Sequence, residues 1–254
     1  MIISERKEVK NLTGVFKREE IKYLLNEDQY RRMRALIAPY MEEDCYGLTT
    51  IYSLYFDTQD DRMIRTSIEK PIYKEKIRLR SYGRPTNGDY PVFLELKKKF
   101  MGTVYKRRVP MTLSQANAYI LHGKLPYDSQ ILREIDYSVK YHGAKPALLM
   151  CYDRLAMAGT QDETIRMTFD RNIRCRRNRL NPVEGDGGLL LLPANNILLE
   201  IKISGAMPLW MTGTLSEIKA YPTSFSKYGA FYEKELCSTE TEFGAYTSRE
   251  AVNC

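Results

Sequence analysis

The sequence predicts an α+β fold, in which antiparallel strands form one sheet and helices pack on it. The main observation is a charge pattern with a period of two inside apolar or aromatic segments, at Lys76, Arg78 and Arg80, at Glu95, Lys97 and Lys99, at Lys106 and Arg108, and at Glu200 and Lys202. Residues i and i+2 of a strand project from the same face, so each segment predicts a strand with one charged face. Short turns between the segments and helical periodicity elsewhere complete the prediction.

The strands are expected at residues 14–25, 49–57, 73–82, 90–99, 103–109, 147–156 and 163–170, in a short segment near residue 173, and at 197–203. Residues 49–57 are rich in β-branched and aromatic side chains, which favour strands. The strands at 73–82, 90–99 and 103–109 are separated by GRPTNGD and by a turn around Gly102, which predicts an antiparallel meander. The stretch 178–196 contains GDGG and is interpreted as a hairpin or loop.

The helices are expected at residues 26–38, 60–69, 114–122, 129–142 and 209–221. Asn26 can cap the first of them and Pro39 stops it. A Thr/Ser cap opens the helix at 114–122. The helix at 129–142 carries Ile131, Leu132, Ile135 and Val139 on one side, so its apolar face is expected to pack on the sheet.

Composition limits the class of protein. With 254 residues, 43% hydrophobic and 28% charged, the chain is expected to form a single domain over 1–254, with a frayed tail from about residue 238. The net charge of +7 points to an anionic partner, which could be a nucleic acid, an anionic membrane or a phosphorylated metabolite. The sequence has no long apolar run and its first residues are charged, so a soluble, cytoplasmic protein is expected.

The few cysteines and histidines offer little material for other chemistry. The five cysteines have no CxxC spacing, so they are interpreted as reduced thiols, and the two histidines are interpreted as structural. There is no GxxxxGK[ST] loop and no kinase-like motif set, so phosphates would have to be held by side chains. In FSKY at 225–228, a hydroxyl beside a cation could hold a phosphate end, although such a pair is more often structural.

The alternating residues predict one cationic surface. The inward set is Arg18, Glu20, Lys22, Lys76, Arg78, Arg80, Glu95, Lys97, Lys99, Lys106, Arg108, Arg154, Arg166, Glu200 and Lys202. So many cations on one surface repel each other by about 4 kcal/mol per pair at ~4 Å unless anions neutralise them, so a pocket for phosphate chains is predicted. Glu95 is interpreted as neutralising a neighbouring cation. Glu200 is the first candidate to bind Mg²⁺ or Mn²⁺ together with substrate phosphates, and Glu20 is the second.

An ordered series of short motifs resembles a known family, the polyphosphate polymerase domain of the vacuolar transporter chaperone complex, within the triphosphate tunnel metalloenzymes. The matching pieces are FKREEIKY at 16–23, IRLRSYG at 77–83, FLELKKK at 93–99, YKRRV at 105–109, YDRLA at 152–156, RMTFDRNI at 166–173, LLEIKISG at 198–205 and FSKYG at 225–229. Each motif is weak alone, but together they span nearly the whole chain in the family's order.

The resemblance implies an antiparallel, eight-stranded β-tunnel with helices outside, which transfers the γ-phosphoryl group of ATP to a growing polyphosphate chain. It assigns phosphate binding during catalysis to Lys22, Arg78, Arg80, Lys97, Lys106, Arg154 and Lys202. Arg171, Ser226 and Lys227 are further phosphate ligands by the resemblance, while Arg18, Lys99, Arg108 and Arg166 are added by their inward parity. Glu200 is implied to hold the divalent metal, Mn²⁺ or Mg²⁺.

Two departures from the family bear on function. Relatives in eukaryotic complexes carry a regulatory domain and membrane helices, so this chain is expected to be a free-standing, bacterial-type catalytic domain, with a separate membrane partner as an open question. The hydrolytic branch of the superfamily usually begins with an ExExK strand, whereas this chain has Arg18-x-Glu20-x-Lys22, which favours the polymerase branch.

Other functions stay open at this point. A triphosphatase in the same tunnel differs only in using water as the acceptor, and a non-catalytic polyphosphate-binding module would need the cations alone. A nucleic-acid binder ranks well below these, because the aromatic residues near the cations form no recognisable stacking motif. The oligomeric state is not readable from the sequence.

Overall fold

A computed structural model describes residues 18–237 of the chain. One antiparallel sheet dominates it, and its strands follow the order β1-β9-β7-β6-β2-β3-β4-β5, with β8 paired to β7 beside this path. The strands are β1 Arg18–Leu25, β2 Met41–Asp57, β3 Tyr73–Tyr82, β4 Pro91–Phe100, β5 Thr103–Thr112, β6 Lys145–Gly159, β7 Arg166–Arg176, β8 Leu189–Leu190 and β9 Ile197–Ser204. The predicted α+β class and the antiparallel meander β3-β4-β5 are confirmed.

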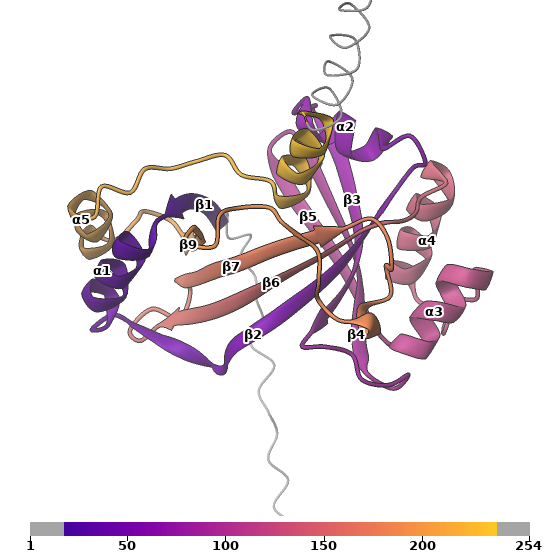
Figure 1. Ribbon diagram of the computed structural model, residues 1–254, viewed down its shortest axis with the longest axis horizontal. Coiled ribbons are helices and arrows are strands. Elements are labelled where there is room, and N and C mark those ends of the chain that lie inside the picture. Colours follow the sequence, from indigo (N-terminus) through magenta and orange to yellow (C-terminus); the bar gives the residue numbers. More distant parts are fainter. Residues whose placement is uncertain (1–17, 238–254) are drawn as a thin grey trace, which may run out of the picture.

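Helices lie at both sides of the molecule, and α2 lies at its top (Figure 1). They are α1 Glu27–Ile37, α2 Arg62–Ile68, α3 Leu113–His122, α4 Gln130–His142 and α5 Leu209–Glu217, with a short 3₁₀ turn at Pro182–Glu184. Asn26 and Thr112 cap α1 and α3, each in a capping box with the glutamine three residues later. The capping residues read from the sequence therefore begin these helices, because their side chains accept bonds from otherwise unpaired backbone N–H groups.

Two apolar cores lie between the helices and the outer face of the sheet. In one of them, α3 and α4 pack against β3, β4 and β5, with Leu132 and Ile135 fully buried against strand residues such as Leu94. In the other, α1 and α5 pack against β1, β9 and β7 around residues such as Met33 and Phe169. The strand residues in these two cores point to the outer face, so the alternate residues of the same strands face inward.

A third core lies on the inner face, where residues 227–237 form a helix. Its Tyr228 and Phe231 pack on Tyr55, Leu148 and other inward residues. This helix was not predicted, because its short apolar stripe follows a loop and runs into a polar tail. It fills part of the space that the curved sheet encloses, and in Figure 1 it lies beside α2 at the top of the molecule.

The remaining differences from prediction concern element ends. β2 begins at Met41, eight residues before the expected strand, because its polar first half pairs with the end of β6 across an irregularity between Glu43 and Leu48. β7 is one strand where two were expected, and its register shift against β6 falls where Asn172 has a φ of 48°. Residues 14–17 and the tail from 238 lie outside the described residues. No helix within 18–237 is both long and apolar enough to cross a membrane.

Candidate functional site

The strand register brings the alternating charges to one face, which we call the inner face. Arg78 lies opposite Glu95, and Glu95 opposite Arg108. At the other end of the strand order, on β1, β9 and β7, Lys22 lies opposite Glu200, and Lys202 lies opposite both Glu20 and Arg166. With Lys227 from the inner helix, the described inward cations include Lys22, Lys74, Lys76, Arg78, Arg80, Lys97, Lys99, Lys106, Arg108, Arg154, Arg166, Lys202 and Lys227, and the inward carboxylates include Glu20, Glu95, Asp170 and Glu200.

The first cluster is built around Glu95 on β4. Its carboxylate lies 2.6 Å from Arg78 Nε, 3.0 Å from Lys106 Nζ and 3.5 Å from Arg108 Nε. Burial alone would raise the pKa of Glu95, but the cations Arg78, Arg80 and Lys106 outweigh it and lower the pKa to about 2. Glu95 therefore holds several cations together, as its sequence interpretation expected.

The second cluster is built around Asp170 and Glu200. Asp170 is fully buried and accepts two hydrogen bonds from Arg154, at 2.6 and 2.7 Å, while Lys227 Nζ lies 2.6 Å from it. Glu200 lies 3.2 Å from Lys227 and 3.7 Å from both Lys22 and Arg154. Burial opposes ionisation of both carboxyls, yet the adjacent cations hold both pKa values below their usual range. One fixed pair of anions thus orders the surrounding cations.

Tyr152 on β6 connects the two clusters. Its hydroxyl accepts a hydrogen bond from Arg80 at 2.9 Å, and Arg154 and Lys227 lie 5.2 and 4.8 Å from its ring centroid. Ser53 Oγ also accepts from Arg80, at 3.3 Å. These contacts fix a guanidinium that is itself buried, so Arg80 is oriented before any ligand arrives.

The sheet is open, since its end strands β1 and β5 are not paired with each other, and we call the space over its inner face the tunnel. Lys97 on β4 interacts electrostatically with Glu20 and Lys22 on β1 and with Glu200 on β9, although these strands are far apart in the sheet order. Burial and the neighbouring cations lower the pKa of Lys97 despite an exposed side chain. Lys97 is thus exposed to solvent and lies within electrostatic reach of β1 and β9.

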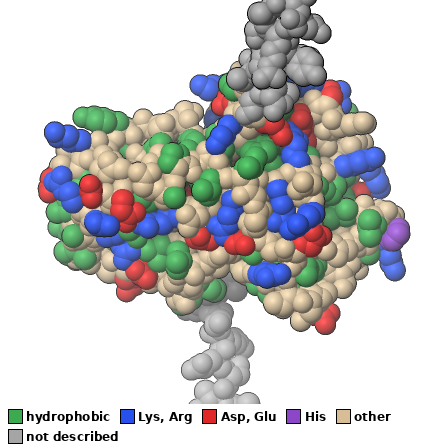
Figure 2. All heavy atoms as spheres, in the orientation of Figure 1, with side chains coloured by type: hydrophobic (Ala, Val, Ile, Leu, Met, Phe, Trp, Pro, Cys, Tyr) green, Lys and Arg blue, Asp and Glu red, His purple; other side chains and the backbone are tan. Residues whose placement is uncertain are grey.

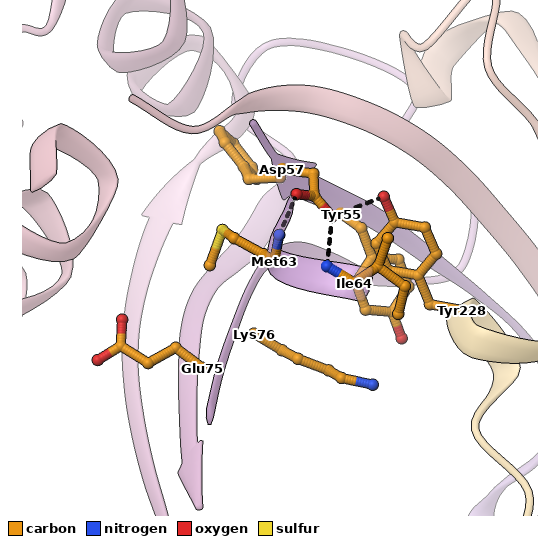
Figure 3. A pocket seen from close by; sticks show the side chains of 8 residues that line it. Tyr55, Asp57, Met63, Ile64, Glu75, Lys76 and Tyr228 are labelled. Carbon is orange, nitrogen blue, oxygen red and sulfur yellow. Dashed lines mark hydrogen bonds between the residues drawn. The ribbon is translucent and has the colours of Figure 1, made fainter. Parts of the chain in front are cut away.

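Residues 221–227 run from β1 to β3, which are separated by four strands in the sheet order. Thr223 N donates to the backbone of Lys22, whose ammonium donates to Phe225 O at 2.8 Å. On β3, Lys76 Nζ lies 3.0 Å from Ser226 Oγ. Figure 3 shows Lys76 pointing to the same side as Tyr228, whereas Glu75 points away on the other side of the strand. Ser226 and Lys227 are thereby brought to the cationic face.

Most of the residues expected from the sequence come together, but a few do not. Arg171 lies on the outer face, where it pairs with Glu27 at 3.3 Å and stacks over Tyr30 at 4.1 Å, because it alternates with the inward Asp170 in the regular part of β7. Lys99 and Arg166 have inward parity and are exposed towards the two ends of the tunnel. Arg18 begins β1, but its side chain lies outside the described residues.

Sequence reasoning missed three residues of the site. Asp170 continues the alternation of Arg166 and Thr168, so the period of two could have found it. Tyr152 likewise precedes Arg154 by two positions. Ser53 carries no comparable signal, because a serine in an apolar strand is common and only the pairing of β2 with β3 sets it opposite Arg80.

The acidic residues fit a divalent cation only in part. Glu20 and Glu200 share the two lysines Lys22 and Lys202, at 3.4 to 3.9 Å. Opposite Glu200, the buried hydroxyl of Thr168 has no hydrogen-bond partner. No group of three or more His, Cys, Asp or Glu residues suited to a metal occurs within 18–237. A hard cation held here would therefore need substrate phosphates and water to complete its shell, as Mg²⁺ commonly does.

Charge dominates the chemistry of the tunnel. Among the described inward residues named above, cations clearly outnumber carboxylates, although the whole chain carries a net charge of only +7. In Figure 2, basic and acidic side chains form a band across the middle of the face shown, between the two helical sides. The arrangement can bind a polyanion and stabilise negative charge that develops on it.

The Glu95 cluster predicts a pH dependence of folding. The pKa of Glu95 is lowered to about 2 in the folded protein, so its contribution of roughly 3 kcal/mol is present above its unfolded pKa and is lost as pH falls towards 2. We expect the free energy of unfolding, measured by urea titration, to fall between pH 5 and 3. That slope should be shallower in Glu95→Gln, and an unchanged slope would contradict the assignment.

The chain is similar to a known family in sequence and to known proteins in fold. The family model described as the VTC domain matches residues 17–235. No curated protein sequence matches. Among solved structures, a candidate adenylate cyclase from Bacillus halodurans aligns with a TM-score of 0.51 at 12% identity, covering 82% of this chain and 95% of that one.

Two further structures align less closely. A candidate adenylate cyclase from Vibrio parahaemolyticus has a TM-score of 0.46 at 11% identity, covering 87% of this chain and 99% of that one. The Mimivirus capping enzyme triphosphatase has a TM-score of 0.34 at 10% identity, covering 80% and 88%. At such identities a likeness concerns the fold alone, and of these three structures the one from Bacillus halodurans is similar enough to support it.

Proposed function

Because this chain belongs to the VTC domain family, we propose that it is a metal-dependent polyphosphate polymerase, which transfers the γ-phosphoryl group of ATP to a growing polyphosphate chain. The observation that carries the proposal is the opposed pair of anchored cation clusters inside one tunnel. Glu95 fixes one cluster, on β3 to β5, and Asp170 with Glu200 fixes the other. A linear phosphate chain between them would contact both.

The extent of the cationic lining favours a polymer. Inward cations run from Lys99, near the end of β4, to Lys202, near the end of β9, and successive members of one strand lie about 6.6 Å apart. Three phosphoryl groups would leave many of these charges without a partner. A longer polyphosphate would neutralise more of them, and Coulomb repulsion among the unpaired cations makes that occupancy favourable.

In the proposed reaction, a terminal oxygen of the polyphosphate attacks the γ-phosphorus of ATP. A bond forms to that oxygen, the bond to the β,γ-bridging oxygen breaks, and ADP leaves with the electron pair. Arg78, Arg80 and Arg154 are each held by a carboxylate or hydroxyl before the ligand binds. They can therefore stabilise charge on the transferred group without reorganising, while Lys22, Lys97, Lys106 and Lys202 position the two chains.

A divalent cation, Mg²⁺ or Mn²⁺, fits this proposal. Glu200 would hold it, with Glu20 as a second carboxylate on the neighbouring strand. When bound, it would supply positive charge that neutralises part of the negative charge of the phosphates during transfer. The lysines that now pair with Glu200 and Glu20 would be free to pair with the phosphates that bring the metal.

A triphosphatase is the second candidate, since it needs the same cations and carboxylates with water as acceptor. The residues lining the tunnel do not distinguish the two acceptors. A non-catalytic binding module is the third candidate, and it would use the cations without needing Glu200.

The test is to incubate purified protein with ATP and Mn²⁺, or with Mg²⁺, and to resolve ADP, orthophosphate and polyphosphate. We expect ADP and long polyphosphate to accumulate together. Inorganic tripolyphosphate supplied as the only substrate serves as the control for hydrolysis. Orthophosphate as the only new phosphate species would identify a hydrolase, and binding without turnover would identify the binding module.

A further inference from the structure

One end of the tunnel carries an aromatic group beside the cations. Tyr82, the last residue of β3, and Phe93 on β4 meet edge to face with ring centroids 5.8 Å apart. The Arg108 guanidinium lies 3.5 Å over the Phe93 ring and 5.3 Å from the Tyr82 ring. We call these three residues the aromatic collar.

The collar belongs to the inner face. Tyr82 continues the alternation of Arg78 and Arg80 on β3, and Phe93 lies opposite Arg80 in the strand register. Burial tends to raise the pKa of Tyr82, but the nearby cations Arg80 and Arg108 outweigh it and lower the pKa, so the hydroxyl lies in the field of the tunnel cations.

Part of the collar is open to a ligand. Tyr82 is 42% exposed and the Arg108 side chain 34% exposed, while Phe93 is half-buried and supports them. Arg108 Nε is buried without a hydrogen-bond partner, so packing on Phe93 and the attraction of Glu95 hold this guanidinium. A flat cation and an aromatic ring are thus presented together to the tunnel.

The other end of the same two strands differs. There, Tyr73 and Phe100 also meet, at 6.4 Å, but they have the parity of the outer face. Tyr55, which does face inward at that end, is buried against Tyr228 at 5.1 Å. Of these aromatic groups, only the collar offers an accessible ring to the tunnel interior.

We propose that the aromatic collar of Tyr82, Phe93 and Arg108 is the nucleobase subsite, which stacks the base of a nucleoside triphosphate and so sets the end at which the nucleotide binds. Aromatic rings and arginine planes stack on every base, and stacking is largely tolerant of sequence. This inference rests on the proposed function, because it takes a nucleotide as the phosphoryl donor.

The spacing along β3 agrees with this orientation. Tyr82, Arg80 and Arg78 follow one another at steps of about 6.6 Å on the same face. A base on Tyr82 would direct its phosphates towards Arg80 and Arg78, and then towards the Glu200 cluster. The remaining length, towards Lys76 and Lys99, would be left for the acceptor chain.

The test compares two ligands that differ by the nucleoside. Binding of the β,γ-imido analogue of ATP and of inorganic tripolyphosphate is measured by calorimetry with Mn²⁺, for wild type, Tyr82→Ala and Tyr82→Trp. Tyr82→Ala should weaken analogue binding by roughly 5- to 150-fold and leave tripolyphosphate binding within about twofold. Tyr82→Trp should retain analogue binding, because it keeps a stacking surface.

Tyr105→Ala is the matched control, since Tyr105 is 52% exposed on β5 with outer parity. It should change neither affinity. Equal weakening of both ligands in Tyr82→Ala, or no weakening of either, would overturn the subsite. These measurements need no turnover, so a failed polymerase assay leaves them readable and concerns the proposed function alone.

Discussion

Replacing Glu200 with glutamine is expected to lower kcat for polyphosphate synthesis by about 100-fold or more while triphosphate binding is retained. Glutamine keeps the shape of the side chain but loses the charge that would hold the divalent cation, and metal neutralisation contributes several kcal/mol to phosphoryl transfer. Binding should survive, because Lys22, Lys227 and Arg154 around Glu200 remain in place and attract the anionic phosphates. Initial rates of ADP release at saturating ATP, together with calorimetry, measure both effects.

Glu20→Gln is the control for Glu200→Gln. The Glu20 side chain is about 35% exposed and Glu200 about 10%, so the second carboxylate is better solvated and its loss should cost less activity. Unchanged turnover in Glu200→Gln would contradict the metal assignment of Glu200. Loss of binding along with turnover would instead identify Glu200 as an organiser of the neighbouring lysines.

Replacing Asp170 with asparagine is expected to lower the free energy of unfolding by about 3–5 kcal/mol. Asp170 is fully buried and balances both Arg154 and Lys227, so the substitution leaves two buried cations with one carboxylate fewer. Removing one partner of a buried ion pair is costly because the remaining charge stays desolvated. Urea titration at neutral pH measures the change.

Glu43→Gln tests whether burial of the ion pair causes the large loss of stability expected for Asp170→Asn. Glu43 pairs with Arg34 at 2.6 Å, a distance equal to the Asp170 contacts, but it is largely exposed. An exposed pair contributes only about 0–1 kcal/mol, so this variant should remain close to wild type. Equal effects of the two substitutions would show that the Asp170 network contributes no more than a surface pair.

Much of the fold is local and could be predicted. Asn26 and Thr112 are read as caps because capping is a contact between residues three apart. The inward parity of Arg78, Arg80, Lys97 and Glu200 follows from the two-residue repeat of a strand, which no neighbour can alter while the strand stays regular. Ile173 shows the limit: the irregularity beside Asn172 reverses the alternation of β7, so that Ile173 and Cys175 join the inner core.

The sequence by itself determined that the strands alternate, that their charged sides are cationic, and that a polyanion is the ligand these sides suit. Tertiary structure alone decided which charges meet. Asp170 with Lys227, and Arg80 with Tyr152, are contacts across 57 and 72 positions of the chain, and they exist only once the sheet has curved and residues 221–227 have crossed it. The physical reason is that side-chain parity is a property of one strand, whereas the partner of a buried charge depends on the path of the whole chain.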